Sequence, residues 1–282
     1  MSFTTLIEPA ALGRILGHDD LLVVDCRFDI ADPQRGAREY AFAHIPGAVY
    51  ADLDRDLSDL WKADLGRHPL PDAEAFCEAL GRWGWTPRTQ VVAYDAASGA
   101  NAAARLWWML RLIGHRDAAV LDGGLPAWNS VAWPLSSDTV RRRCTAVEAR
   151  FDAEEIVYTD TLQKIREDVV LLDARAAPRF RGEVEPIDSV AGHVPGARNR
   201  PFSDNLTADG RFKSAAALRE EFSKLIAPSY PRDVVHMCGS GVTACHNLLA
   251  MEHAGLTGSR IYGPSWSGWI ADPTRPVERS DA

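Results

Sequence analysis

The chain alternates short apolar runs with longer stretches in which apolar residues recur at helical spacing. Four runs are almost continuously apolar, the pattern of parallel strands that are buried on both faces: residues 21–27, 90–95, 169–175 and 233–238. Segments of helical length separate them, at residues 72–84, 102–115, 214–226 and 243–256. Strands that alternate with helices predict an α/β fold, with a mostly parallel sheet flanked by helices.

This pattern occurs twice. Four segments return later in the chain in the same order: 23–27 at 171–175, 43–48 at 192–197, 91–94 at 234–237, and 121–128 at 262–269. Such a repeat predicts two homologous domains. We place the first at residues 1–130 and the second at 158–282. Residues 131–157, with Pro134 and an arginine run at 141–143, break the periodic pattern and are interpreted as a linker.

The amino-acid composition of the chain excludes several classes of protein. With 282 residues, 46% hydrophobic, the chain is long enough for two packed cores and too apolar to be disordered. Its net charge of −8 argues against a nucleic-acid partner. No apolar stretch approaches the ~20 residues of a membrane span, and no signal peptide is apparent at the amino terminus. Five widely spaced cysteines do not suggest a disulfide framework, so we expect a cytoplasmic protein.

Cys238 is the strongest candidate for chemistry. It ends an apolar strand and is followed by Gly239-Ser240-Gly241-Val242-Thr243 and then by a helix that begins near Ala244. A loop with two glycines can turn its N–H groups toward one point, and the helix start adds further donors. A sulfur in that position should be stabilised as the thiolate, the nucleophilic form. The first repeat has Asp95 at the equivalent position, so we expect the first domain to lack this activity.

These residues resemble the two-domain rhodanese-type sulfurtransferases over about residues 5–277. The resemblance rests on the tandem repeat, the motifs 43–48 and 192–197, the loop 238–243 and the segment 262–269. It implies tandem rhodanese-like domains and a persulfide on Cys238. The sequence CGSGVT is typical of 3-mercaptopyruvate sulfurtransferases, whereas members that prefer thiosulfate typically carry CRKGVT. The resemblance further implies cyanide, a small thiol or thioredoxin as acceptor, and no cofactor or metal.

The resemblance also suggests substrate-binding residues. Gly239 and Ser240 add no cation, which favours a donor whose anionic group lies away from the loop, and Gly241, Val242 and Thr243 complete the loop. Arg179 matches the substrate-binding arginine of the family, whose planar guanidinium can hold a carboxylate. Arg175 matches a neighbouring structural arginine that would pair with Asp173. In mercaptopyruvate enzymes a second arginine lies nine positions after the first, but here that position is Asp188. Arg181 or Arg198 could compensate.

By the same resemblance, His68 and Asp54 match the proposed partners of the loop serine. Ser240, His68 and Asp54 would then form a proton relay. From the sequence alone, a histidine before proline is more often a loop residue than a base.

Alternatives stay open at this stage. Cys238 could be a buried structural cysteine, or the chain a non-catalytic binding module. A phosphatase needs an arginine six positions after the cysteine, where this chain has Ala244. Thiosulfate could replace mercaptopyruvate as donor. Other features are interpreted as structural: His44 and His193 in repeated turns, residues 183–185 as a solvated acidic face, and Cys245, His246 and His253, which lack metal-site spacing.

Overall fold

The computed structural model describes residues 2–280, except for the side chain of Ala63, and divides into two compact units. The first unit comprises Met1–Asp59, Leu70–Asp152 and Ala208–Phe212. The second comprises Leu60–Pro69, Ala153–Thr207 and Lys213–Ala282. The segment Leu60–Pro69 therefore belongs to the second unit, although it lies within the first sequence repeat. The linker boundaries at 131 and 157 stay a prediction.

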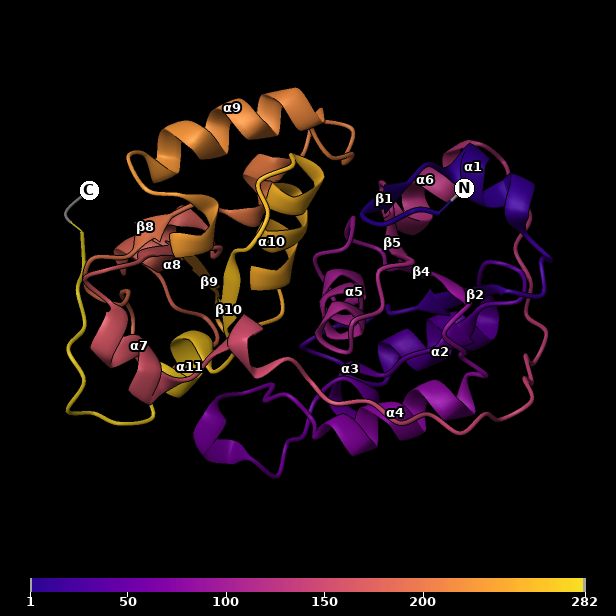
Figure 1. Cartoon of the computed structure of the whole chain (residues 1–282), viewed down its shortest axis with the longest axis horizontal. Helices are drawn as coiled ribbons and strands as arrows, with labels where there is room; N and C mark the ends of the chain where they lie inside the picture. The colour runs from indigo at the N-terminus through magenta and orange to yellow at the C-terminus, as the bar shows by residue number, and fades with distance from the viewer. Residues whose placement is uncertain (1, 281–282) are drawn as a thin grey trace. The chain divides into compact units, whose positions relative to one another are not determined.

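The first unit is built on a five-stranded parallel sheet (Figure 1). Its strands lie in the order β1 (Leu6–Ile7), β5 (Ala118–Leu121), β4 (Gln90–Tyr94), β2 (Leu21–Asp25) and β3 (Val49–Tyr50). Its helices are α1 (Pro9–Ile15), α2 (Arg35–Phe42), α3 (Leu53–Asp56), α4 (Ala73–Arg82), α5 (Ala103–Leu112) and α6 (Gly124–Ser130).

The second unit repeats this plan. Its parallel strands lie in the order β6 (Ile156–Val157), β10 (Arg260–Tyr262), β9 (Val234–Met237), β7 (Val170–Asp173) and β8 (Arg198–Asn199). Its α-helices are α7 (Thr159–Ile165), α8 (Ala177–Arg181), α9 (Ala215–Ile226), α10 (Ala244–His253) and α11 (Ser265–Trp269). Four short 3₁₀ turns also lie in this unit: η1 (Ala63–Leu65), η2 (Ala153–Glu155), η3 (Phe202–Asn205) and η4 (Pro231–Asp233). The matching strand order confirms the fold class expected from the sequence.

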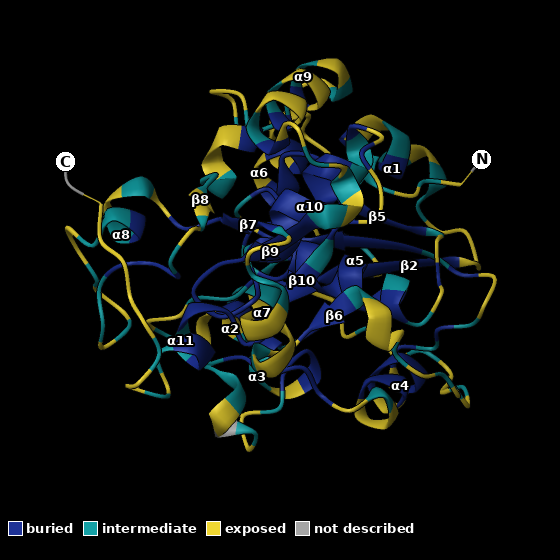
Figure 2. Cartoon of the chain, turned by 60° about the vertical axis from the view of Figure 1, so that its left-hand side comes forward, coloured by how far each residue is buried: buried dark blue, intermediate teal, exposed yellow. Residues whose placement is uncertain are grey.

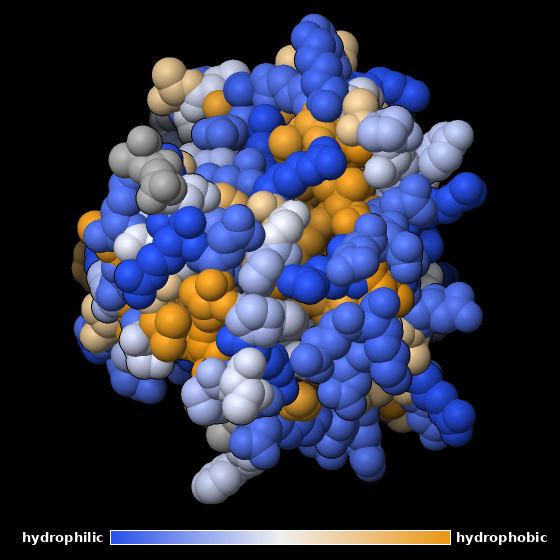
Figure 3. Space-filling view, turned by 90° about the vertical axis from the view of Figure 1, so that its left-hand side faces the viewer, coloured by the Kyte–Doolittle hydropathy of each residue, from blue (hydrophilic) through white to orange (hydrophobic). Residues whose placement is uncertain are grey.

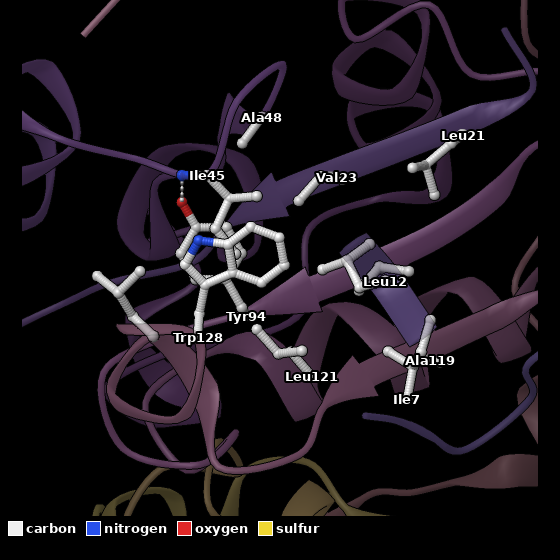
Figure 4. Packing of buried hydrophobic residues seen from close by; sticks show 12 residues of the cluster. Ile7, Leu12, Leu21, Val23, Ile45, Ala48, Tyr94, Ala119, Leu121 and Trp128 are labelled. Atoms are coloured by element: carbon white, nitrogen blue, oxygen red, sulfur yellow. Dashed lines mark hydrogen bonds between the residues drawn. The ribbon is translucent and has the colours of Figure 1, made fainter. Parts of the chain in front are cut away.

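In the first unit the sheet is packed on both faces, which explains its continuous apolar strands. One face packs against α1 and α6, which contribute Leu12 and Trp128 to a cluster with Val23 and Tyr94 (Figure 4). The Tyr94 hydroxyl lies within this cluster and accepts a hydrogen bond from the Ile45 amide, 3.1 Å away. Helix α5 packs against β4 and β5.

In the second unit, successive residues of β9 serve opposite faces of the sheet. Val235 and Met237 pack in one cluster with Trp266 and Trp269 of α11. Helix α10 covers the other face and is itself covered by α9, so α10 is largely buried whereas α9 exposes its outer side (Figure 2). Helix α9 buries Leu218, Phe222 and Ile226, spaced four residues apart. On the face drawn in Figure 3, hydrophilic side chains predominate and apolar ones form separate patches.

In each repeat an arginine connects the end of a strand to the neighbouring turn through hydrogen bonds. Arg175 forms a buried ion pair with Asp173, 2.7 Å between Nη2 and Oδ2, and the same Nη2 donates to the Gly192 carbonyl. Arg27 pairs with Asp25 and donates to the Ala43 carbonyl in the equivalent position. The expected structural role of Arg175 is confirmed. In the adjoining turns, Nδ1 of His44 and of His193 each lie 2.7 Å from a backbone carbonyl oxygen.

Two further observations bear on the sequence analysis. Residues 131–152, all described, form no helix or strand, and one isolated bridge pairs Ser136 with His44. Among residues 2–280, none of the helices has the length and apolar character that crossing a bilayer requires.

A substitution of Trp128 tests the assignment of the hydrophobic core in the first unit. It is fully buried, and its Nε1 donates to the Pro134 carbonyl. We predict that Trp128→Ala lowers the free energy of unfolding by about 3–5 kcal/mol, because the substitution leaves a large cavity. Chemical denaturation measures this. Trp61→Ala is the matched control, since Trp61 is 97% exposed, and should change stability by less than about 0.5 kcal/mol. Equal losses in the two variants would contradict this assignment of the core.

Candidate active site

Cys238 lies directly after β9, the central strand of the second sheet, at its carboxyl end. The Gly241 amide points at its sulfur, with 3.1 Å between N and Sγ. Gly241 has φ of +80°, a conformation that favours glycine, and α10 begins at Ala244 as expected. The sequence thus curls back on itself within three residues and aims a main-chain donor at the sulfur.

Helix α11 holds this loop from the other side. The Ser265 hydroxyl accepts from the Cys238 amide at 3.1 Å. The amides of Trp266 and Ser267 donate to the carbonyls of Cys238 and Gly239, at 3.0 and 2.9 Å. Helix α11 therefore fixes three main-chain groups of the loop, which is the condition for a preorganised site.

The loop is largely buried in the structure. Cys238 is 2% exposed and Ser240 7%, Gly239, Gly241 and Val242 are buried, and Thr243 is half-buried. A buried cysteine surrounded by hydrocarbon alone would be structural. The amide aimed at Sγ distinguishes Cys238 from that case.

The equivalent loop of the first unit has an aspartate in place of the cysteine. Asp95 follows β4, the central strand of its sheet, and is fully buried. Its two carboxyl oxygens accept hydrogen bonds from five main-chain amides at 2.8–3.2 Å, from residues 97, 99, 101, 102 and 103. This loop is an anion cradle that the chain fills with its own carboxylate.

Burial and hydrogen bonding shift the pKa of the Asp95 carboxyl in opposite directions. Burial is the larger effect, so the pKa is raised although the amide hydrogen bonds lower it. All five partners are donors, so the hydrogen bonds themselves favour the carboxylate form. Cys26, buried in the same unit, provides a contrast: burial, followed by the charge of Asp95, raises the pKa of its thiol well above the usual range. These surroundings disfavour a thiolate at Cys26.

His68 reaches the loop from the segment Leu60–Pro69. Its Nδ1 lies 2.8 Å from Ser240 Oγ, and both side chains are buried. The structure thus brings together two members of the expected relay. Asp54 lies on α3 of the first unit, where its amide donates to the Asp52 side chain. Its pairing with His68 stays a prediction.

Arg179 lies beside the loop within a cluster of charges. Its Nε and Nη2 donate to the Glu185 carboxylate, with 2.7 Å between Nη2 and Oε1, and Nη2 also lies 3.1 Å from Asp188 Oδ2. Asp188 in turn accepts from Arg67 Nη1 through Oδ1. Burial would raise the pKa of Glu185, but the hydrogen bond from Arg179 and other donors outweigh it and lower that pKa.

One expectation for this region is wrong. Glu185 is not part of a solvated face: its side chain is 4% exposed and paired with Arg179, whereas Glu183 is exposed. The suggestion that Arg181 or Arg198 compensates for the missing arginine stays a prediction. Arg181 pairs with Glu183, and Arg198 donates to the Leu225 carbonyl. Besides Arg179, the guanidinium that reaches Asp188 is that of Arg67.

Cys245 and His246, which lack metal-site spacing, are buried within the second unit. The Cys245 thiol donates to the Gly241 carbonyl at 3.3 Å, and His246 Nδ1 lies 3.1 Å from the Asn205 amide nitrogen. Across residues 2–280, no cluster of His, Cys, Asp and Glu side chains is suited to a metal ion. All five cysteines are free thiols.

Comparison with known families gives one matching model, described as "Rhodanese-like domain", over residues 8–131 and again over 158–272. Both repeats are therefore matched, each around its central strand and loop. The two matches together cover most of the chain.

Individual relatives match along nearly the whole length. A Pseudomonas aeruginosa protein named "Probable 3-mercaptopyruvate sulfurtransferase" is 48% identical over 285 residues, covering 100% of both chains. A Mycobacterium tuberculosis protein named "Putative thiosulfate sulfurtransferase SseB" is 38% identical and covers 98% of both. Among solved structures, the 3-mercaptopyruvate sulfurtransferase from Leishmania major superposes with a TM-score of 0.84 at 31% identity, covering 96% of this chain and 76% of that one.

Asp95 gives a direct test of the cradle. In Asp95→Asn, an amide NH₂ would face main-chain N–H donors and leave some of them without an acceptor. We predict that the free energy of unfolding falls by about 2–3 kcal/mol, measured by chemical denaturation. Asp19→Asn, at an exposed position of the same unit, should leave stability unchanged. No loss in Asp95→Asn would show that the amides do not depend on a charged acceptor.

Proposed function

The chain belongs to the rhodanese-like family and is a sulfurtransferase, and we propose that Cys238 carries the transferred sulfur as a persulfide. The observation that supports this is the geometry after β9: a cysteine at the carboxyl end of the central strand, with the Gly241 amide 3.1 Å from its sulfur. In open parallel sheets, this edge is where ligands bind. A small-molecule donor and a small-molecule acceptor are the substrates of such a reaction.

The first half-reaction forms the covalent intermediate. The Cys238 thiolate attacks the thiol sulfur of the donor, and the bond between that sulfur and carbon breaks. The electron pair of the broken bond remains on carbon, so 3-mercaptopyruvate leaves as the pyruvate enolate, which then takes up a proton. The enzyme keeps the sulfur as a Cys238 persulfide that still carries the proton of the donor thiol. Once this proton has passed to the enolate, the loop amides stabilise the persulfide anion.

We propose 3-mercaptopyruvate as the donor. Gly239 and Ser240 place no cation in the loop, so the anionic group of the donor must be held from outside it. Arg179 is a suitable holder, because its Nη2 lies 3.7 Å from the position that a Cβ on Gly239 would occupy. A guanidinium beside the loop fits a carboxylate that lies some bonds away from the reacting sulfur.

Ser240 and His68 are proposed to move the proton. The Ser240 hydroxyl lies within hydrogen-bond distance of His68, and in this loop it is close in sequence to the reacting sulfur. It can give a proton to the enolate and recover one from His68, and Asp54 is proposed as the group that orients the imidazole. Gly239, Gly241, Val242 and Thr243 supply the main chain of the cradle.

In the second half-reaction a nucleophile takes the outer sulfur. The acceptor attacks that sulfur, the sulfur–sulfur bond breaks, and its electron pair returns to Cys238 as thiolate. Cyanide, a small thiol or the dithiol of thioredoxin would serve. A cytoplasmic location, where such thiols are reduced, stays a prediction.

The covalent step predicts a mass change. After incubation with 3-mercaptopyruvate, intact-protein mass spectrometry should show a gain of about one sulfur (~32 Da), which disappears when a thiol is added. Cys238→Ser should show neither the gain nor any turnover while keeping its fold. Cys245→Ser, seven positions later, should behave as the unmodified chain does. Sulfur loading that survives in Cys238→Ser would place the intermediate elsewhere.

The donor assignment is tested by steady-state kinetics with cyanide as acceptor. We predict a kcat/KM for 3-mercaptopyruvate at least about tenfold above that for thiosulfate, because the loop itself adds no positive charge for a dianion. A ratio at or below one would make the protein a thiosulfate sulfurtransferase that uses the same persulfide.

A further inference from the structure

The first unit contains a cavity that the proposed function does not use. Its volume is about 570 Å³, within the range of roughly 300–1,000 Å³ that small-molecule sites occupy. Leu21 and Val23 form one wall, at the beginning of β2 and on the face of the sheet that carries Trp128 (Figure 4). Since the strands are parallel, the Asp95 loop lies at the opposite edge of this sheet. The cavity is therefore separate from both strand-end loops described above.

A second wall of the cavity is aromatic. Trp133 stacks on the buried ring of Trp128, with 5.6 Å between centroids and 26° between the ring planes. It also packs against α1 at Gly13, where a Cβ would lie 2.5 Å from Trp133 Cζ2. The indole is thus held from two sides but remains 36% exposed, and it lines the cavity. A flat ligand could stack on such a surface.

Arg142 brings a positive charge to the same cavity. Its Nη2 donates to the Leu21 carbonyl at 2.7 Å, and its stem packs against Gly84, where a Cβ would lie 3.0 Å from Arg142 Cβ. Burial lowers the pKa of this guanidinium, and no carboxylate acts on it in the opposite direction within the described residues. The Leu21 carbonyl is the one acceptor for Arg142 that residues 2–280 supply, so most of its five N–H donors are available to a ligand.

The second repeat treats the equivalent place differently. There Arg166 follows the last residue of α7, and its Nη1 donates to the carbonyl of Pro195 at 3.2 Å. Pro195 is the counterpart of Pro46, which borders the cavity of the first unit, and Leu16 stands after α1 where Arg166 stands after α7. In the second unit the arginine is thus part of the local turn. In the first unit the cation comes from residue 142, far along the chain.

We propose that this cavity binds an aromatic carboxylate, with the carboxylate on Arg142 and the ring on Trp133. A planar guanidinium can hold a carboxylate through two parallel hydrogen bonds, and Leu21 and Val23 give the ring an apolar surroundings. Asp19 also borders the cavity but is exposed and forms no ion pair with Arg142 within the described chain. With one cation and this acid nearby, the site favours a single negative charge over a dianion.

The test uses isothermal titration calorimetry on the full chain, with 2-naphthoate as the probe and 2-naphthamide as its uncharged analogue. We expect 2-naphthoate to saturate one site with a Kd below about 1 mM, and 2-naphthamide to bind at least about tenfold more weakly. Arg142→Gln should raise the Kd of 2-naphthoate about tenfold or more and leave that of 2-naphthamide unchanged. Trp133→Ala should weaken both ligands about 3- to 10-fold.

Two control variants locate the effect. Arg143→Gln changes the exposed neighbour of Arg142 and should alter the Kd by less than about twofold. Arg179→Gln removes the guanidinium beside the Cys238 loop and should leave the Kd unchanged, which separates this cavity from the proposed sulfur-donor site. The denaturation midpoint of Arg142→Gln without ligand should equal that of the parent.

The proposal would be overturned by any of four results: no saturable binding of 2-naphthoate, equal affinity for 2-naphthamide in the parent chain, an unchanged Kd in Arg142→Gln, or loss of binding in Arg179→Gln. The comparison of the two ligands in the parent chain requires no substitution, so it decides the matter even if a variant fails to fold. None of these results depends on sulfur transfer by Cys238.

Discussion

The structure depends on one constraint: where the central strand of each sheet ends and a helix follows, main-chain N–H groups of the loop point at one residue and need an acceptor there, five at Asp95 and that of Gly241 at Cys238. In the first unit Asp95 supplies it and saturates the loop with five hydrogen bonds. In the second unit the acceptor is the Cys238 sulfur. A carboxylate fills such a cradle permanently, whereas a sulfur can take up and release a second atom. Under the proposed function, the residue type at the end of the strand separates a structural loop from a reactive one.

The central parts of the fold could be predicted because their patterns are local. Strands β2, β4, β7 and β9 are buried on both faces, so their apolar character is continuous and appears directly in the sequence. The outer strands could not be predicted in this way. Strands β1, β3, β6 and β8 are two residues long and exist only through pairing with a neighbour, which is a tertiary property.

The same division applies to the site. Cys238 and its loop are contiguous in the sequence, so the loop could be recognised from its residues alone. The ion pair of Asp173 and Arg175 could likewise be expected, because the two residues are only two positions apart. The acceptor of Arg179 could not be inferred, because the acidic run 183–185 looks solvated until the turn after α8 folds Glu185 inward. The contact between Arg67 and Asp188 could not be inferred either, although Arg67 directly precedes His68. Nothing in the sequence shows that the segment Leu60–Pro69 joins the second unit, since it lies in the first repeat.

The central claim is that loop amides hold the transferred sulfur on Cys238. A crystal structure of the protein incubated with 3-mercaptopyruvate tests it most directly. We predict one additional sulfur atom bonded to Cys238 Sγ, within hydrogen-bond distance of main-chain amides of residues 239–243. Additional sulfur on any other cysteine, or an outer sulfur on Cys238 directed away from those amides, would contradict the account.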